Sequence, residues 1–356
     1  MDAPPSRRSP ARLLLITGGA ALSLALAGGL LYVFRPGADP EPVAAPEPLA
    51  YAGDYHLGAR PLGPAAPDDI AAKLAPLWSE DIDGVTFDFG TTAVMDADFR
   101  ALEGRIDNPL TGKPYRNDVL LSSADVYHEA LLGTGDFADE PLADPDGLRT
   151  LGNITPWVTQ FVVPADSDIE TLADLAGRRM AADEHLGPPE EAMLILAVAG
   201  VDPLNDLEYV SDPFVTYEPL MSGEADFYAT VDRVHSGEIN HMADQGLELR
   251  VLDVPREVIA KLALLEPGTT ALTIAAGEHP ALEDADEITL AASWTSLYTT
   301  DRLDADLAYL LVEAAFERLP EKMPSEWIRA QDALAGIEPD TLHPGARRYY
   351  EEQGLL

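Results

Sequence analysis

Short apolar segments typical of strands alternate with longer segments of helical periodicity along most of this chain, and this alternation limits the possible folds more than any other feature. It predicts an α/β protein, in which parallel sheets carry helices on their faces. The clearest helix is expected over 301–318, where apolar residues form one stripe and Thr300 or Asp301 is positioned as N-cap. The expected strands are 85–89, 119–122, 159–163, 179–182, 208–210, 226–231 and 248–252.

The N-terminal region predicts where the folded part of the chain lies. Arg7, Arg8 and Arg12 precede an uncharged apolar run over 13–34. At about 1.5 Å per residue, a helix over this run would span a bilayer core of about 30 Å. The basic flank, residues 1–12, is expected on the cytoplasmic side, which places the rest of the chain in the periplasm or outside the cell.

Both a cleaved signal peptide and an uncleaved inner-membrane anchor remain open for this run. Ala25 and Ala27 are small residues of the kind that a signal peptidase accepts, but the apolar run continues past them. The following stretch, 35–67, is rich in Pro and Ala and has no apolar periodicity. We expect it to be an extended linker, and we expect the fold to begin near Asp68.

The charge balance excludes one class of partner. The chain has 62 acidic and 23 basic residues and a formal net charge of −39, and such a surface repels nucleic acid. An acidic face that keeps the protein soluble and an adaptation to high external salt both explain this charge, and we favour the halophilic explanation. The chain has no Cys, which excludes disulfides, thiolate metal sites and a Cys nucleophile.

A search for catalytic motifs finds no nucleophile elbow, zinc-protease motif, phosphate loop or dinucleotide-binding turn. The densest polar cluster is Asp232, His235, Glu238 and His241. On a helix, three-residue steps rotate the direction by about 60° each, so its first and last members would point to opposite sides. We therefore expect no enzyme activity, no metal site and no cofactor.

The candidate ligand-binding residues follow from the predicted sheet, because ligands bind at the carboxyl ends of strands in open parallel sheets. Neutral hydroxyls with one or two cations are suited to an organic anion or an amino acid. Some of these residues have a simpler explanation: Thr92 and Ser123 are also in position to cap helices, Trp157 to fill the core, and Glu184 to lie in an acidic loop. The candidates are Thr91, Thr92, Ser122, Ser123, Trp157, Glu184, Tyr228 and Arg233.

Several stretches of the chain match a known family. They are 123–137, 148–154 followed by 160–163, 167–179, 220–227 and a C-terminal stretch. The C-terminal stretch is the most specific; it contains His343-Pro344-Gly345-Ala346 and ends at Gly354. Together these stretches resemble the solute-binding proteins of TRAP transporters of the TAXI subgroup. The resemblance implies a type II periplasmic-binding fold with two lobes, each a mostly parallel sheet flanked by helices. It places lobe 1 at 68–163 and 277–356 and lobe 2 at 164–276, with the chain crossing between them near Pro164 and Gly277.

The resemblance also implies a function. A receptor of this family captures a small polar organic solute, such as an amino acid or organic acid, closes by hinge motion and delivers it to TRAP permease subunits in the membrane. The chain departs from the family at two ligand-contacting loops, where 89–95 and 182–187 lack the usual glycines. Asp183, Glu184 and His185 there would disfavour a carboxylate and suit a cationic or zwitterionic group. These departures leave open a second hypothesis, that the chain is a membrane-anchored sensory or scaffolding subunit.

Overall fold

A computed structural model describes residues 49–59, 67–91, 95–104, 106–108, 112–213, 215–275, 277–279 and 287–356. All of them belong to one folded unit, which spans 48–356. Residues 1–12 and 13–34, for which we expected a basic flank and a signal peptide or anchor, lie outside the described ranges. Within those ranges, no helix combines the length and the apolar character needed to cross a bilayer.

Most strands belong to one mixed sheet of ten strands. They are β1 (Gly53–Ala59), β2 (Val85–Thr91), β5 (Val119–Ser123), β6 (Leu148–Pro164), β7 (Arg179–Asp183), β8 (Glu208–Asp212), β9 (Phe227–Asp232), β10 (Leu249–Val251), β11 (Thr270–Ala275) and β12 (Glu287–Thr300). The order is β2-β1-β5-β12-β6-β9-β7-β8, with β10 paired to β6 and β11 to β12. A separate small sheet pairs β3 (Ile106–Asp107) with β4 (Pro114–Tyr115).

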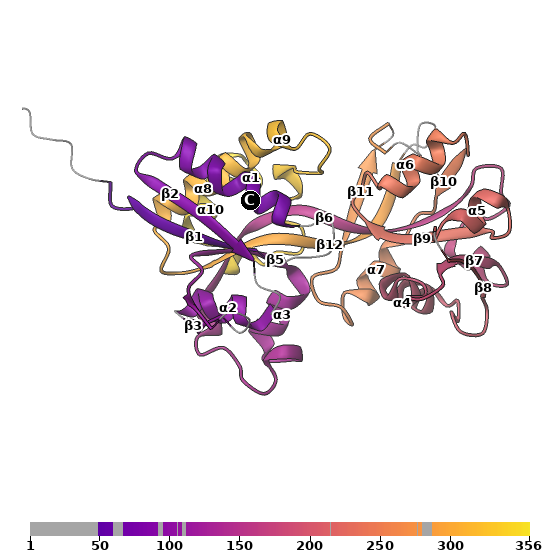
Figure 1. Ribbon diagram of the computed structural model, residues 1–356, viewed down its shortest axis with the longest axis horizontal. Coiled ribbons are helices and arrows are strands. Elements are labelled where there is room, and N and C mark those ends of the chain that lie inside the picture. Colours follow the sequence, from indigo (N-terminus) through magenta and orange to yellow (C-terminus); the bar gives the residue numbers. More distant parts are fainter. Residues whose placement is uncertain are drawn as a thin grey trace, which may run out of the picture. The chain divides into compact units, whose positions relative to one another are not determined.

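The sheet has two groups of parallel strands, joined by two long antiparallel ones. Strands β2, β1 and β5 are parallel to one another, and so are β8, β7 and β9. Strand β6 pairs antiparallel with β12, and both strands run from one group to the other, as Figure 1 shows. We call β1, β2 and β5 with the helices around them the first lobe, and β7 to β11 with theirs the second lobe.

Helices cover both lobes. They are α1 (Pro67–Asp81), α2 (Met95–Glu103), α3 (Ala124–Leu132), α4 (Glu190–Ala199), α5 (Glu218–Ser222), α6 (Gly237–Asp244), α7 (Arg256–Leu262), α8 (Ala305–Glu317), α9 (Leu319–Lys322) and α10 (Pro344–Glu352). Short 3-10 turns lie at 135–137, 145–147, 172–175, 330–332 and 339–341. Helices α1, α8 and α10 bury Trp78, Leu311 and Tyr350 in one core cluster of the first lobe, and α4 and α7 bury Ile195 and Ile259 in the second lobe.

The alternation of strands and helices is therefore confirmed, with three corrections. The linker expected over 35–67 does not extend over Gly53–Ala59, because β1 forms there by pairing with β2 on one side and β5 on the other. The expected strand 159–163 is only the end of β6. Helix α8 begins later than expected, since its N-cap is Asp304, whose carboxylate accepts from the backbone nitrogens of Asp306 at 2.9 Å and Leu307 at 3.1 Å.

The crossings between the lobes also differ from the expectation. Pro164 pairs with Leu249 at the end of β6 inside the second lobe, and Gly277 follows β11 inside the same lobe. Strand β12 instead changes partners around Thr295, because residues 287–292 pair with β11 and residues 295–298 with β5. The chain passes between the lobes within continuous strands, which a prediction based on breaks in apolar segments does not locate.

The C-terminal motif docks α10 on α8. The ring of His343 accepts from the backbone nitrogen of Gly345 at 3.2 Å and donates from Nε2 to the carbonyl of Leu303 at 3.0 Å. Burial lowers the pKa of His343, in keeping with this neutral ring. At Gly345, a Cβ atom would lie 2.1 Å from the carbonyl oxygen of Ala305. The glycine therefore allows the two helices to touch through their backbones.

Candidate functional site

A cavity of about 970 Å³ lies where the two lobes meet. Each lobe supplies the first turn of a helix, α3 in the first lobe and α4 in the second, and the segment after α7 closes a third side. The crossing strands β6 and β12 form its floor. The lining residues that matter for its chemistry are Ser123 and Asp125 from the first lobe, Glu190, Glu191 and Glu266 from the second, and Trp157 and Ser293 from the crossing strands.

The register of the strands arranges polar side chains on the floor in rows. Thr295 of β12 lies opposite Ser123 of β5 and Thr155 of β6, and Ser293 lies opposite Trp157. Residues two apart on a strand share a face, and so do residues directly opposite each other. The row of Ser123, Thr295 and Thr155 is therefore next to the row of Trp157 and Ser293 and on the same face.

Two hydroxyls in the row of Ser123 have no hydrogen-bond partner within the described part of the chain. They belong to Thr155 and Thr295, which are only 4% and 1% exposed. A buried hydroxyl without a partner costs roughly 1–3 kcal/mol relative to a paired one, and most buried polar groups are paired. The two threonines are not among the residues that line the cavity. They lie beneath its floor, on the face that Ser123, Trp157 and Ser293 share.

Carboxylates face the cavity from three elements. Asp125 lies in the first turn of α3, and Glu190 and Glu191 lie in the first turn of α4. The pKa of Glu266, which follows α7, is raised by burial and then by the negative charges of Asp125, Glu191 and Glu190. None of the described residues that line the cavity is Lys, Arg or His. The cavity is therefore strongly acidic.

A turn at the end of β7 leads the chain to α4. The carboxylate of Asp183 accepts from the backbone nitrogens of His185 at 2.7 Å and Leu186 at 2.6 Å. These bonds hold the pKa of Asp183 below its usual range and keep the carboxylate occupied within its own turn. Glu184 is exposed in this turn and does not line the cavity.

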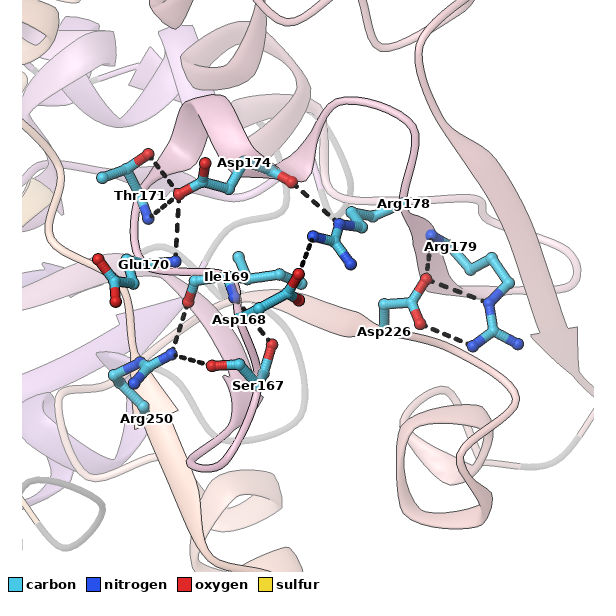
Figure 2. A network of polar contacts seen from close by, with 10 residues as sticks. All are labelled: Ser167, Asp168, Ile169, Glu170, Thr171, Asp174, Arg178, Arg179, Asp226 and Arg250. Atoms are coloured by element: carbon cyan, nitrogen blue, oxygen red, sulfur yellow. Dashed lines mark hydrogen bonds and ion pairs between the residues drawn. The ribbon is translucent and has the colours of Figure 1, made fainter.

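The segment before β7 is fixed by a polar network, which Figure 2 shows. Arg250 of β10 donates to the carbonyl oxygens of Ser167 at 2.9 Å and Ile169 at 2.6 Å. Arg178 donates to the carboxylate of Asp168 at 2.9 Å, and Thr171 forms a capping box with Asp174. The network explains the motif 167–179 as a structural element that holds β7 and, through it, the start of α4.

Arg179 and Asp226 complete the network and make the stability of the second lobe depend on pH. Arg179 Nη2 lies 2.6 Å from Asp226 Oδ1, and this contact lowers the pKa of Asp226. A lowered folded-state pKa contributes stability above the unfolded value of about 4 and loses it as the pH falls through the folded value. We expect Asp226→Asn to lower the free energy of unfolding by about 1 kcal/mol at neutral pH, since the pair is partly exposed.

The measurement is urea unfolding of both proteins between pH 7 and pH 2. The difference between them should disappear below pH 4, as Asp226 of the unmodified protein takes up its proton. A difference that stays constant down to pH 2 would show that the carboxylate charge is not responsible.

The structure brings two of the predicted ligand residues to the cavity. Ser123 and Trp157 line it, although Ser123 occupies the N-cap position of α3 without a side-chain capping bond. Ser122 is buried on the opposite face of β5. The backbone of Thr91 ends β2, and Thr92 lies outside the described residues.

Tyr228 and Arg233 have protein partners instead of a place in the cavity. The buried hydroxyl of Tyr228 donates to the carboxylate of Glu238, and burial raises its pKa. Arg233 Nη1 lies 2.5 Å from Glu326 Oε1. We therefore do not retain Ser122, Glu184, Tyr228 or Arg233 as ligand contacts.

The histidines of the polar cluster noted in the sequence, His235 and His241, likewise have separate protein partners. Both ring nitrogens of His235 lie near carbonyl oxygens, those of Ser325 at 3.2 Å and Glu278 at 2.9 Å. His241 packs against the ring of Tyr217. No group of three or more His, Asp or Glu able to hold a metal ion occurs among the residues that the structure describes.

Sequence reasoning missed the carboxylates and the row of threonines. Acidic first turns are common helix starts, so Asp125, Glu190 and Glu191 carried no distinct signal. Glu266 reaches the cavity from a segment far away in the chain, and the position of Thr295 depends on a strand that was not expected. The first turns of the helices that follow the expected strands 119–122 and 179–182 could have been examined, because the ends of these strands predicted where a ligand would approach.

The described residues thus form an α/β protein of two lobes joined by crossing strands, with an acidic cavity at their junction. The chain belongs to the NMT1-like family, whose model matches residues 92–354. This match identifies the family but does not distinguish the TAXI subgroup.

Three solved structures to which this chain is similar are of proteins named as solute-binding proteins or receptors. A TctC solute-binding protein from Polaromonas shares 12% identity over 84% of this chain and 88% of its own, with a TM-score of 0.45. The L-cystine solute receptor of Neisseria gonorrhoeae shares 12% over 78% and 95%, with a TM-score of 0.40. The aliphatic sulphonate-binding protein SsuA of Escherichia coli shares 13% over 76% and 79%, with a TM-score of 0.36.

Proposed function

We propose that this chain is the extracytoplasmic solute-binding receptor of a TAXI-type TRAP transporter. It captures a small polar organic solute, of the amino acid or organic acid class, and delivers it to permease subunits in the membrane. The observation that carries the proposal is the cavity of about 970 Å³ at the junction of the lobes. Its volume is in the range that encloses a small molecule, and Ser293, Trp157 and Trp294 are among its lining residues.

The crossing strands provide the conformational change that a receptor needs. Two strands, β6 and β12, run from one lobe to the other, and their pairing shifts register between Thr295 and Ser296 and again between Leu297 and Tyr298. Irregularities of this kind bend strands locally. Hinge motion at these positions would bring the first turns of α3 and α4 together around a solute, and the closed form would dock on the permease.

The place of the receptor follows from the N-terminal apolar run over 13–34. As a signal peptide or an anchor, this run delivers the folded part to the periplasm or the outer face of the inner membrane. Where the run is an uncleaved anchor, the segment that follows it, up to the start of β1 at Gly53, serves as the tether.

The test is solute-dependent thermal stabilisation of the full chain, measured with a panel of amino acids, dicarboxylates, keto acids and polyamines. At a concentration one hundred times its dissociation constant, a bound solute adds about 2.7 kcal/mol to the stability, which raises the melting temperature by a few degrees. Trp157→Ala removes an aromatic side chain that lines the cavity and is expected to weaken binding about tenfold or more. Tyr209→Ala, at an exposed aromatic that does not line the cavity, should leave binding unchanged.

Two outcomes would count against the proposal. A folded protein that no member of the panel stabilises would favour a sensory or scaffolding subunit. Equal binding by the Trp157→Ala variant and the unmodified chain would place the solute outside this cavity.

A further inference from the structure

Both helices that begin at the cavity have their positive ends occupied by the chain's own carboxylates. The N-terminus of a helix ordinarily attracts an anion through its free backbone N–H groups and its dipole. Asp125 stands in the first turn of α3, and Glu190 and Glu191 stand in that of α4, and neither helix has a side-chain cap. An anionic solute would therefore meet negative charge at both places where a helix could hold it.

The fourth carboxylate shows that these charges lie close enough to act on one another. Glu266 reaches the cavity from the segment after α7, and its pKa is raised by burial and by Asp125, Glu191 and Glu190. Like charges held together in this way favour protonation or a bound cation. No lining residue that the structure describes supplies a balancing positive charge.

The floor of the cavity offers an independent indication. The exposed Ser293 and the half-buried Trp157 lie opposite each other and line the floor. Beneath them, on the same face, the hydroxyls of Thr155 and Thr295 are buried without a partner among the described residues. A hydroxyl oxygen accepts hydrogen bonds from an ammonium group, and an indole ring attracts a cation to its face. Both features suit the same kind of group, and neither depends on the carboxylates.

We infer that the solute taken by this cavity is an organic cation that bears at least one ammonium or guanidinium group, such as a basic amino acid or a polyamine. The inference rests on the proposed function, because it names the solute class of the same cavity. The carboxylates of α3, α4 and the segment after α7 surround the charged group, while Ser293 and Trp157 contact it from the floor. Organic anions are excluded by the same charges.

The test is isothermal titration of the full chain with L-arginine, L-lysine, putrescine, L-glutamine, L-glutamate and succinate, each at low and at high salt. The cavity variant is Asp125→Asn with Glu266→Gln. Its matched control is Asp139→Asn with Glu140→Gln, which also removes one Asp and one Glu carboxylate, but from an exposed segment. The two variants have the same net charge, so the general attraction of cations to an acidic protein acts equally on both.

We expect one or more of the cations to bind the unmodified chain, and the cavity variant to raise the dissociation constant about 10- to 100-fold, since two charge-assisted contacts are lost. The control should change it by less than about twofold, because exposed charges outside the cavity contribute little. The persistence of binding at high salt would further separate a site from a diffuse ion atmosphere.

Three other results would overturn the inference in distinguishable ways. Binding of L-glutamate or succinate without any cation would refute the charge class and leave the receptor function intact. Equal loss in the cavity and control variants would show that cations only accumulate at the acidic surface. Failure of every probe, charged or neutral, would count against both the solute class and the proposed function.

Discussion

Replacing Gly345 by alanine is expected to lower the free energy of unfolding by about 3 kcal/mol or more. The new Cβ atom would lie 2.1 Å from the carbonyl oxygen of Ala305 and 2.7 Å from the backbone nitrogen of Tyr309. Both atoms belong to the backbone of α8 and cannot rotate away as a side chain would. Helix α10 would have to move off α8, and the contacts of Tyr349 and Tyr350 with the first-lobe core would be lost with it.

The measurement is chemical unfolding followed by circular dichroism, with Gly237→Ala as the matched control. Gly237 is the first residue of α6, and a Cβ atom there meets nothing within 4 Å. Alanine at such a helical position is neutral or slightly stabilising. If Gly345→Ala unfolds at the same denaturant concentration as the unmodified protein, the helices are not in backbone contact and the docking described for the C-terminal motif is wrong.

Removing the guanidinium of Arg233 is the second change for which we expect a large effect. Arg233 lies just after β9 in the second lobe, and its partner Glu326 is 3% exposed at the side chain. Arg233→Ala would leave a buried carboxylate without this cation, and we expect a loss of about 2–4 kcal/mol in the free energy of unfolding. The pair matters for function as well, because it ties the second lobe to the segment after α9.

That segment belongs to the cores of both lobes. Trp327 packs in a cluster of the second lobe and the neighbouring Ile328 in the cluster of α1, α8 and α10. An ion pair at this junction fixes the segment where the lobes meet. Arg233→Ala is therefore expected to weaken solute binding as well as stability, because the geometry of the junction sets the positions of the cavity walls.

The comparison variant is Arg318→Ala, which breaks a more exposed ion pair with Asp81 within the first lobe, where the side chains are 47% and 22% exposed. Exposed pairs contribute about 0–1 kcal/mol, so its effect on urea unfolding should be small. The double variant Arg233→Met with Glu326→Leu should recover much of the stability, because it removes the buried charge together with its partner. A loss of equal size for Arg233→Ala and Arg318→Ala would contradict the importance of burial.

Local sequence patterns located most of the second lobe. The expected strands 179–182, 208–210, 226–231 and 248–252 agree with β7, β8, β9 and β10 within two residues at each end. Parallel strands covered by helices on both faces form continuous apolar segments between polar ones. Glycines such as Gly200 and Gly223, which end α4 and α5 in the left-handed conformation, separate these segments.

The same patterns failed where strands depend on their neighbours. Strand β1 has only a short buried end, Leu57 to Ala59, and its other residues are ordered by backbone pairing with β2. Strand β12 was not expected at all, although it links the two lobes. Hydrogen bonds to distant strands form such elements, and apolar periodicity within a short window does not report those bonds.

The sequence by itself determined the alternation of strands and helices, the high negative charge and the kinship carried by the C-terminal motif, because each depends on residue types close together in the chain. Only the tertiary structure decided the chemistry of the cavity. It places Asp125, Glu190 and Glu266, which belong to three separate elements, around one space, and it aligns Thr155 with Thr295 by strand register. The physical reason is that charge repulsion and unpaired hydroxyls depend on distances of a few ångströms, which only packing of distant segments fixes.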